Sequence, residues 1–285
     1  MFPGFNTNGL AHHPFFDALA LLKSFDYAAV ALTLDHDLVQ RVGERFLWRF
    51  PPDEIASRLR FLGLRSVVET GARFLLDPFH KHQPNWLDPA PHKRRLRTAF
   101  YKSAVDFAAA LQSDCVSIWS GAPPFGTSEA ADVLLSRLVQ ELCDFLPYAT
   151  RRGVKIAFEP EPGMFIDTTQ SFDRLLERLG NAAPSLADAL YLTLDVGHLW
   201  CQNEPLAPTI ERYAGRLINI HLDDARRGSH EHLPLGEGEI PFDEIFYTLE
   251  KIGYTNGIYA EISRHSHCGA ESAAETRRFL RRYFA

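Results

Sequence analysis

The chain has 285 residues, of which 46% are hydrophobic, and its formal net charge at pH 7 is −6. This length suits an α/β barrel, which folds as one unit of about 250 residues. The negative charge argues against a nucleic-acid-binding protein, which needs a basic surface. No run of about 18 apolar residues is present, so we expect no membrane span.

The amino terminus and the cysteines indicate the compartment. The first residues, MFPGFNTNGLAHH, lack both the basic start and the long apolar core of a secretory signal. The cysteines are far apart in the sequence and form no CxxC pair: Cys115, Cys143, Cys201 and Cys268. Scattered cysteines of this kind are typical of reduced thiols. We therefore expect a cytoplasmic protein.

Apolar runs alternate with helical patterns along the first half of the chain. Short apolar runs predict strands over residues 4–8, 28–34, 65–69 and 115–119. Apolar residues spaced by three and four predict helices between these strands, over residues 15–25, 52–62 and 92–112. A long polar insert, 73–90, separates the third strand from the helix that follows it.

The second half repeats this alternation. Strands are predicted over residues 154–158, 190–194, 216–220 and 257–260. Helices are predicted over residues 129–152 and 168–180, from Pro241 onward, and over 270–283. Regular alternation of strand and helix favours parallel pairing through right-handed crossovers. The sequence therefore predicts a (β/α)8 TIM barrel, as a single domain over residues 1–285. A doubly wound open sheet would want GxGxxG after the first strand, and that motif does not occur there.

The last four predicted strands each end in an ionisable residue, namely Glu159, Asp195, His221 and Glu261. In a barrel, the carboxyl ends of all strands face one mouth. Three carboxylates gathered there would raise one another's pKa values unless a cation lay among them. A solvated strand end would explain any one of these residues, but not their recurrence at four strands. We predict one divalent metal ion at these residues, and a set of three oxygen ligands and one imidazole suits Mn²⁺, Mg²⁺, Co²⁺ or Zn²⁺.

Several short motifs extend this pattern between about residues 150 and 265: KIAFEPEPG, LTLDVGH, NIHLDD, HLPLGEGEIPF and IYAEIS. Together they resemble the xylose-isomerase-like TIM barrels, a group of sugar and sugar-phosphate isomerases and epimerases that is related to endonuclease IV. The resemblance implies that the four residues above bind the metal. It also implies that Glu159 and Glu261 double as the catalytic acid and base.

The same resemblance implies residues that contact substrate. His198 completes its D-x-x-H pattern, and Arg227 matches an arginine that grips substrate oxygens, although the adjacent Arg226 leaves that register open. Further candidate contacts are Glu69, Trp119 and His232. The basic loop 73–97 either binds a phosphate or acidic sugar or is simply a solvated surface.

The function expected from these features is metal-dependent isomerisation or epimerisation of a sugar, a sugar phosphate or a related polyol. The reaction would move a proton next to a carbonyl, through an enediolate. The expected partner is this small molecule, without nucleic acid or membrane, and a homo-oligomer stays open. A metal-dependent dehydratase or lyase on the same barrel is an alternative.

Two further alternatives stay open. A multi-zinc phosphoesterase resembling endonuclease IV is favoured by His230 and His232, which with His198 could hold a second metal. It is disfavoured because the histidines expected at the ends of the second and third strands are missing. A non-enzymatic sugar-binding barrel is disfavoured because no member of the acid/base pair or of the metal set is missing.

Overall fold

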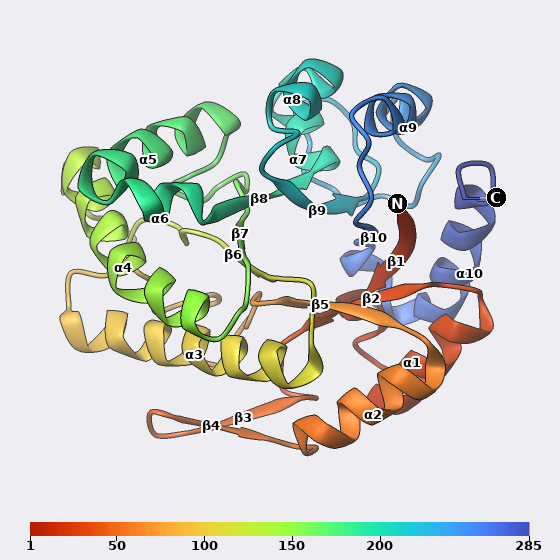
Figure 1. Ribbon diagram of the computed structural model, residues 1–285, viewed down its shortest axis with the longest axis horizontal. Helices are drawn as coiled ribbons and strands as arrows, with labels where there is room; N and C mark the ends of the chain where they lie inside the picture. Colours follow the sequence, from red (N-terminus) through yellow and green to blue (C-terminus); the bar gives the residue numbers. More distant parts are fainter. Residues whose placement is uncertain (285) are drawn as a thin grey trace.

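The computed structural model describes residues 1–284, and its parallel strands close into a barrel in the order β1-β10-β9-β8-β7-β6-β5-β2 (Figure 1). These strands are β1 (Phe2–Asn6), β2 (Ala29–Thr33), β5 (Arg65–Glu69), β6 (Val116–Ile118), β7 (Ile156–Phe158), β8 (Leu190–Asp195), β9 (Leu217–Leu222) and β10 (Gly257–Ala260). The predicted TIM barrel is confirmed. The first strand starts and ends earlier than residues 4–8 because a 3₁₀ turn, η1 (Thr7–Leu10), begins at Thr7.

Helices surround the barrel, and most of them lie within a few residues of the predicted ranges. These are α1 (Phe15–Ser24), α2 (Pro52–Leu62), α3 (Pro91–Leu111), α4 (Ala131–Arg151), α5 (Thr169–Ala182), α9 (Phe242–Lys251) and α10 (Gly269–Leu280). The sequence patterns missed the shorter elements, α6 (Pro184–Asp188), α7 (Val196–Cys201), α8 (Leu206–Arg212) and the 3₁₀ segment η2 (Ser263–Cys268). One or two turns are too short to show a helical period.

A β-hairpin outside the barrel was also missed. It consists of β3 (Val39–Val42) and β4 (Arg45–Trp48), paired antiparallel between β2 and α2. Its aromatic side chains pack on α3, with the ring centroids of Trp48 and Phe107 4.1 Å apart and those of Phe46 and Phe100 5.3 Å apart. Strands of four residues carry too little alternation to be recognised before this packing is known.

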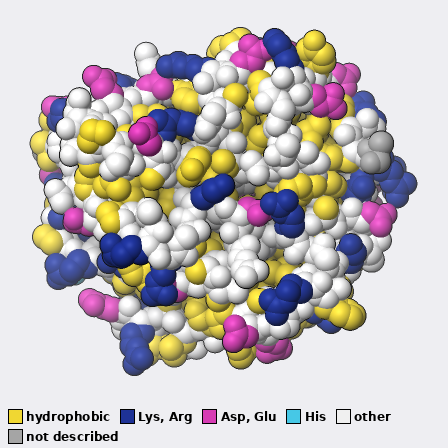
Figure 2. All heavy atoms as spheres, in the orientation of Figure 1, with side chains coloured by type: hydrophobic (Ala, Val, Ile, Leu, Met, Phe, Trp, Pro, Cys, Tyr) yellow, Lys and Arg dark blue, Asp and Glu magenta, His cyan; other side chains and the backbone are white. Residues whose placement is uncertain are grey.

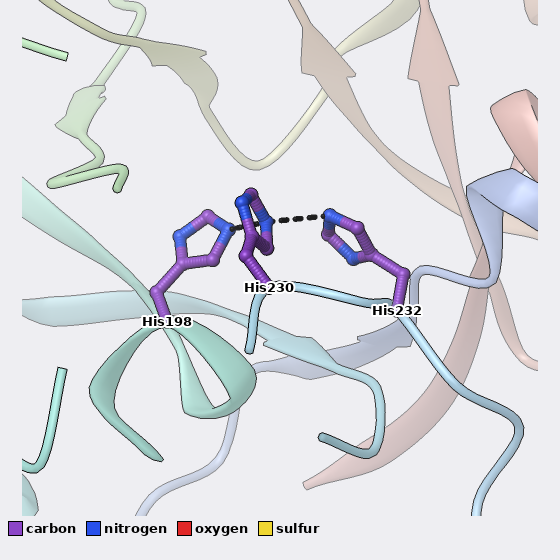
Figure 3. Close-up of side chains that lie close together, drawn as sticks. All are labelled: His198, His230 and His232. Carbon is purple, nitrogen blue, oxygen red and sulfur yellow. Dashed lines mark hydrogen bonds between the residues drawn. The ribbon is translucent and has the colours of Figure 1, made fainter. Parts of the chain in front are cut away.

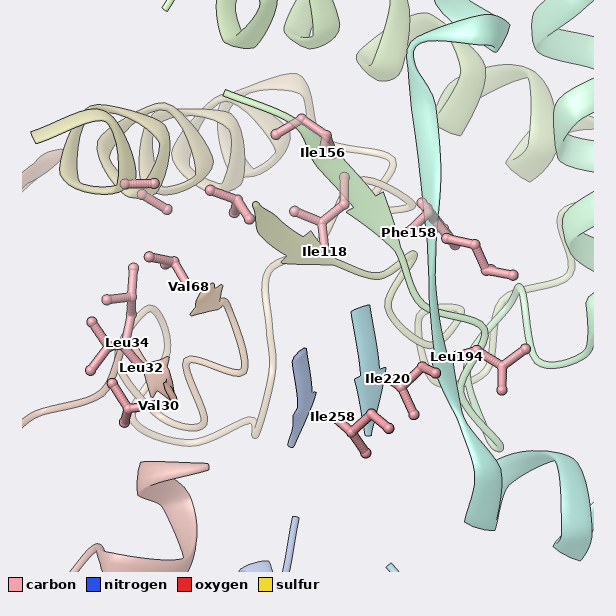
Figure 4. Close-up of a cluster of buried hydrophobic side chains, with 14 of the residues drawn as sticks. Val30, Leu32, Leu34, Val68, Ile118, Ile156, Phe158, Leu194, Ile220 and Ile258 are labelled. Carbon is pink, nitrogen blue, oxygen red and sulfur yellow. The ribbon is translucent and has the colours of Figure 1, made fainter. Parts of the chain in front are cut away.

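The barrel strands divide their side chains between two packed layers. Large aliphatic residues such as Val30, Ile156 and Ile220 point outward and pack between the strands and the helices (Figure 4). The alternate positions point into the barrel, where a smaller cluster consists of Ala29, Ala31, Val67, Cys115, Ala157 and Tyr259. Because side chains alternate along a strand, the second residue after an inward position points inward again, toward the mouth.

Tyr259 fills much of the barrel interior, and two glycines make room for it. A Cβ atom added at Gly4 would lie 2.3 Å from the Tyr259 ring, and one added at Gly257 would lie 2.5 Å from it. The interior below the mouth is therefore closed by side chains, and open space is confined to the carboxyl ends of the strands.

On the face that Figure 2 presents, basic side chains are scattered among acidic ones. Among residues 1–284, no helix combines the length and the apolar character needed to cross a bilayer.

Candidate metal centre and active site

A cavity of about 490 Å³ opens at the carboxyl ends of the barrel strands. The residues at the strand tips line it: Asn6, Thr33, Glu69, Trp119, Glu159, His221 and Glu261. A volume of this size falls in the range of small-molecule sites. The mouth of the barrel is therefore the candidate active site, as expected for this fold.

The four predicted metal-binding side chains meet in this mouth. Ligand atoms of Glu159, Asp195, His221 and Glu261 all lie within 4.8 Å of one another. Nδ1 of His221 lies 3.0 Å from Oε1 of Glu159 and 3.0 Å from Oε2 of Glu261. We call these four residues the metal quartet. Their convergence is the geometry that the strand-end pattern predicted.

The state of Asp195 shows that the quartet fits a cation. Its Oδ1 accepts a hydrogen bond of 3.0 Å from the backbone N–H of His198. Its Oδ2 is buried and has no hydrogen-bond partner among the described residues. A buried carboxylate oxygen without a partner is costly, and a divalent ion would satisfy it. Three carboxylates and one imidazole suit a hard or borderline divalent ion with positions left for substrate oxygens.

Glu69 and Asn219 orient the imidazole of the quartet. Oε1 of Glu69 lies 2.9 Å from Nε2 of His221, and the side-chain amide of Asn219 donates to the same oxygen at 3.0 Å. Holding a proton on Nε2 leaves Nδ1 free to face the two glutamates, which is how a carboxylate orients a metal-binding histidine. Glu69 was predicted as a substrate contact; it lines the cavity, and its direct partner is His221.

The environment drives the two quartet glutamates apart in pKa. Burial raises the pKa of Glu159 to about 8, reinforced by the nearby carboxylates and opposed by His221. Burial acts in the same direction on Glu261, but His221 and His232 outweigh it and hold its pKa below the usual range. Burial would lower the pKa of His221, yet Glu159, Glu69 and Glu261 raise it well above its usual value. Two carboxyl groups with pKa values pushed apart are typical of an acid and base pair.

Three histidines form a cluster (Figure 3), and one of them, His198, lies 3.7 Å from both Glu159 and Asp195 of the quartet. His198 comes from α7, and His230 and His232 come from the loop after β9. The Nε2 atoms of His198 and His230 are 3.1 Å apart, and those of His230 and His232 are 2.8 Å apart. One nitrogen from each ring lies within 4.8 Å of the others. These histidines therefore have the arrangement that a second metal would need.

Asp223 contacts one member of this histidine cluster, His232. Its Oδ2 lies 2.6 Å from Nδ1 of His232, and the side chain is fully buried. A Cβ atom at Gly197 would lie 1.9 Å from Oδ1 of Asp223, so only glycine fits at that position. His232 takes its orientation from this carboxylate, which also raises the pKa of His232 to about 10 against the effect of burial.

Asp224 holds the loop that carries the histidines. Its carboxylate accepts backbone hydrogen bonds from Ala225, Gly236 and Ile240, at 2.9, 2.8 and 3.1 Å. A Cβ atom at Gly238 would lie 2.2 Å from Asp224, which explains the glycine in the GEG turn. One buried carboxylate thereby satisfies several backbone donors that the loop itself leaves without partners.

Three predicted substrate contacts, His198, Trp119 and His232, line the cavity, but Arg227 does not. The guanidinium of Arg227 lies 3.7 Å from the centroid of the Trp200 ring and donates to Oδ1 of Asn203 at 3.2 Å. In this structure Arg227 therefore contacts Trp200 and Asn203, and its predicted contact with substrate stays a prediction. Sequence spacing from a strand end does not fix the path of a loop, and in this one Gly228 takes a positive φ of 74°.

The mouth also contains residues that the sequence motifs did not identify as site residues. Asn8 donates a hydrogen bond of 2.7 Å to Oε1 of Glu261, from a 3₁₀ turn that had been taken for a strand. Glu161 also lines the cavity, and burial raises its pKa to about 7. The EPEPG motif contained a signal for Glu161, since it follows Glu159 by two positions. Lys81 and Arg264 line the cavity as well; Lys81 lies in the basic loop 73–97 that the sequence singled out, and no motif marked Arg264.

Comparison with known proteins agrees with this fold. The family described as xylose isomerase-like TIM barrel matches residues 19–283, and the chain belongs to this family. Among curated relatives, a Methanocaldococcus jannaschii protein, MJ1311, is 26% identical over 61% of this chain and 60% of its own length. Inosose dehydratase of Clostridium perfringens is 24% identical over 40% of this chain and 42% of its own length. The chain thus spans about two fifths to three fifths of these two relatives.

A longer match and two solved structures complete the comparison. Fructoselysine 3-epimerase of Shigella flexneri is 24% identical over 73% of this chain and 76% of its own length. An L-ribulose 3-epimerase structure has a TM-score of 0.78 at 16% identity, covering 99% of this chain and 94% of that chain. The IOLI protein with a zinc atom has a TM-score of 0.76 at 16% identity and covers 100% of both chains. At these identities the solved structures establish the fold alone.

Proposed function

We propose that the protein is a divalent-metal-dependent isomerase or epimerase of a sugar or a related polyol. The observation that carries this proposal is the position of His221 Nδ1, 3.0 Å from both Glu159 and Glu261. Two carboxylates thus lie next to the same imidazole nitrogen, and Asp195 completes a set of ligand atoms within 4.8 Å of one another. Proton transfer next to a carbonyl needs such a pair of carboxylates around the bound carbon.

The metal, when bound, stabilises the negative charge that develops on the substrate oxygens. Glu159 and Glu261 move the proton: one carboxylate removes it from the carbon beside the carbonyl, and the C–H electron pair enters the enediolate double bond. The partner then returns a proton, to the same carbon from the other face in an epimerase or to its neighbour in an isomerase. Asn8 holds Oε1 of Glu261, so that its other oxygen faces the quartet.

The named relatives support this proposal, since they include a fructoselysine 3-epimerase and an L-ribulose 3-epimerase of the same fold. The zinc in the IOLI protein supports a metal on this barrel. Binding of a small polyhydroxylated substrate suits the polar cavity. The residues proposed to contact it are His198, His232 and Trp119, which line the same space.

The proposal is tested by following deuterium incorporation into ketoses and aldoses in D₂O, by NMR, with Mn²⁺, Mg²⁺, Co²⁺ or Zn²⁺ added. Exchange is expected only with metal present. Glu159→Gln and Glu261→Gln are each expected to reduce the exchange rate by about 10²–10⁴-fold. Glu211→Gln, at a surface pair with Lys251, is the matched control. Exchange that survives both quartet changes would place the proton transfer on other residues.

A second candidate is a phosphoesterase that uses two metals, and the histidine cluster favours it. His198, His230 and His232 can hold a second ion close to the quartet, and two neighbouring metals suit phosphate ester hydrolysis. The two candidates differ in metal content and in reaction. Two metal ions per chain, with cleavage of a phosphodiester and no sugar exchange, would establish the hydrolase. A dehydratase, suggested by the inosose dehydratase relatives, would release water from a polyol ketone instead.

A further inference from the structure

The insert between β5 and α3 forms one wall of the cavity, and a buried arginine fixes its shape. Arg73, Lys81 and His82 of this insert line the cavity. The backbone N–H of His82 donates to the carbonyl of Arg73 at 2.6 Å, so the two ends of the wall lie side by side. Arg97 of α3, which is fully buried, donates to the carbonyl of His82 at 2.7 Å and to that of Pro84 at 2.8 Å. The position of Lys81 is therefore set by the hydrogen bond of its neighbour His82 to Arg97 of α3.

Three basic side chains surround the opening, and we call Arg73, Lys81 and Arg264 the cationic rim. Arg264 comes from η2, after β10, and donates to the carbonyl of His230. Among the described residues, neither Lys81 nor Arg264 has a carboxylate within 4.0 Å. Arg73 has one at 3.6 Å, in Asp35. Two of the three charges thus lack an ionic partner within the described chain.

The carboxylates deeper in the cavity are already engaged. Glu69, Glu159 and Glu261 each contact His221. Asn8 donates a further hydrogen bond to Glu261, and Asn219 donates one to Glu69. Glu161 is a further carboxylate of the cavity, and it makes no side-chain ion pair within 4.0 Å among residues 1–284. The mouth thus has acidic side chains at its floor, which suit a cation, and basic side chains at its rim, which suit an anion.

His82 contributes no charge to the rim. Its Nδ1 is buried without a partner in the described structure, and burial together with Lys81 lowers the pKa of its ring to about 3. The ring packs edge-on against Trp119, with centroids 5.1 Å apart. It stays uncharged, so the positive charge of the wall comes from Arg73 and Lys81.

We propose that the cationic rim binds an anionic group, a phosphate or a carboxylate, on the end of the sugar that points away from the metal quartet. This inference rests on the proposed function only in placing the reacting end of the sugar at the quartet. Lysine and arginine bind such oxyanions through charge-assisted hydrogen bonds, which are stronger than neutral ones. A cavity of about 490 Å³ has room for a sugar with this additional group.

Paired ligands test the proposal, with the protein loaded with Mn²⁺. D-Fructose 6-phosphate and D-ribulose 5-phosphate carry a phosphate, D-fructuronate carries a carboxylate, and D-fructose and D-ribulose are their neutral counterparts. Calorimetry gives the dissociation constant of each, and proton exchange in D₂O gives turnover. At least one anionic ligand is expected to bind about tenfold or more tightly than its neutral counterpart. Whether the phosphate ligands or the carboxylate ligand bind more tightly identifies the preferred anionic group.

Three variants link this preference to the rim. Lys81→Gln and Arg264→Gln keep most of the side chain without its charge, and each is expected to lower the ratio of anionic to neutral affinity by about tenfold. Glu161→Gln removes an opposing charge and is expected to raise the ratio. Lys155→Gln, at the amino end of β7 and so at the far end of the barrel, is the matched control and should leave the ratio unchanged. Melting temperatures check that each variant is folded.

The outcomes separate this proposal from the isomerase function. Ketose exchange with equal affinity for charged and neutral ligands supports the isomerase and overturns the anion site. Tight anionic binding that both rim variants weaken, without exchange of any sugar, supports the anion site and contradicts the isomerase. A failure of every anionic ligand to bind, or a ratio unchanged in both rim variants, overturns the anion site in either case.

Discussion

Glu69 and His221 form a buried pair at the mouth of the barrel, with Oε1 of the glutamate 2.9 Å from Nε2 of the histidine. The pair joins the end of β5 to the end of β9, on opposite sides of the barrel order. Nε2 of the imidazole is thus paired with the carboxylate of Glu69, and Nδ1 faces Glu159 and Glu261. The tautomer of His221 is thereby set by a residue that is not itself part of the metal quartet.

Replacing Glu69 by Gln should therefore weaken metal binding without removing any ligand. The amide is a poorer acceptor for the Nε2 proton, so the tautomer with a free Nδ1 is less favoured. A loss in Mn²⁺ affinity of about 10–100-fold is expected, measured by calorimetry. Glu211→Gln on the outer surface serves as the control. An unchanged affinity would mean that Glu69 does not set the tautomer of His221.

Metal binding should also depend on pH through Glu159. Because burial raises the pKa of this carboxyl to about 8, it is protonated at pH 6 and must lose its proton to bind a cation. Proton competition weakens as the pH rises, so affinity should increase from pH 6 to pH 8. His221, whose pKa is raised well above its usual value, must also lose a proton to bind a metal, so the increase should continue above pH 8. Calorimetry in two buffers of different ionisation enthalpy would measure the protons released. An affinity that is constant from pH 6 to pH 8 would contradict this prediction.

Asp224→Asn should destabilise the fold, because the carboxylate serves three backbone donors. The amide nitrogen of Asn would face at least one N–H group that the carboxylate now accepts from. A buried donor without an acceptor costs about 1–3 kcal/mol, so we expect the free energy of unfolding to fall by about that amount. Urea unfolding measures it. Asp243→Asn, on an exposed side chain, should change it by less than about 0.5 kcal/mol.

Arg97→Met should loosen the insert more than the barrel. The change leaves the carbonyls of His82 and Pro84 without their buried donor, while it also removes a buried charge that has no carboxylate partner among the described residues. Limited proteolysis with trypsin should then cut faster after Lys81. Arg95→Met, an exposed change on the same helix, is the control. Equal cleavage in both variants would show that Arg97 does not hold the wall.

The sequence by itself determined the barrel and the metal quartet. Apolar runs of about five residues alternate with helical patterns, which predicts a parallel sheet with helices on its faces. The absence of GxGxxG after the first strand favoured the barrel over an open doubly wound sheet. Glu159, Asp195, His221 and Glu261 could be recognised because each stands where an apolar run stops. In a parallel barrel, the carboxyl ends of the strands share one mouth, so residues at the ends of different strands lie close together in space.

Only the tertiary structure decided which residues surround that quartet. Asn8, Lys81 and Arg264 reach the mouth from segments whose direction depends on turns and on long-range contacts, such as those of Arg97. Arg227 carried a motif that pointed to substrate, yet in this structure its side chain stacks on Trp200. Periodicity fixes the side chains of strands and helices, because their backbone geometry is regular. The path of a loop is instead set by partners distant in sequence, and no local pattern records them.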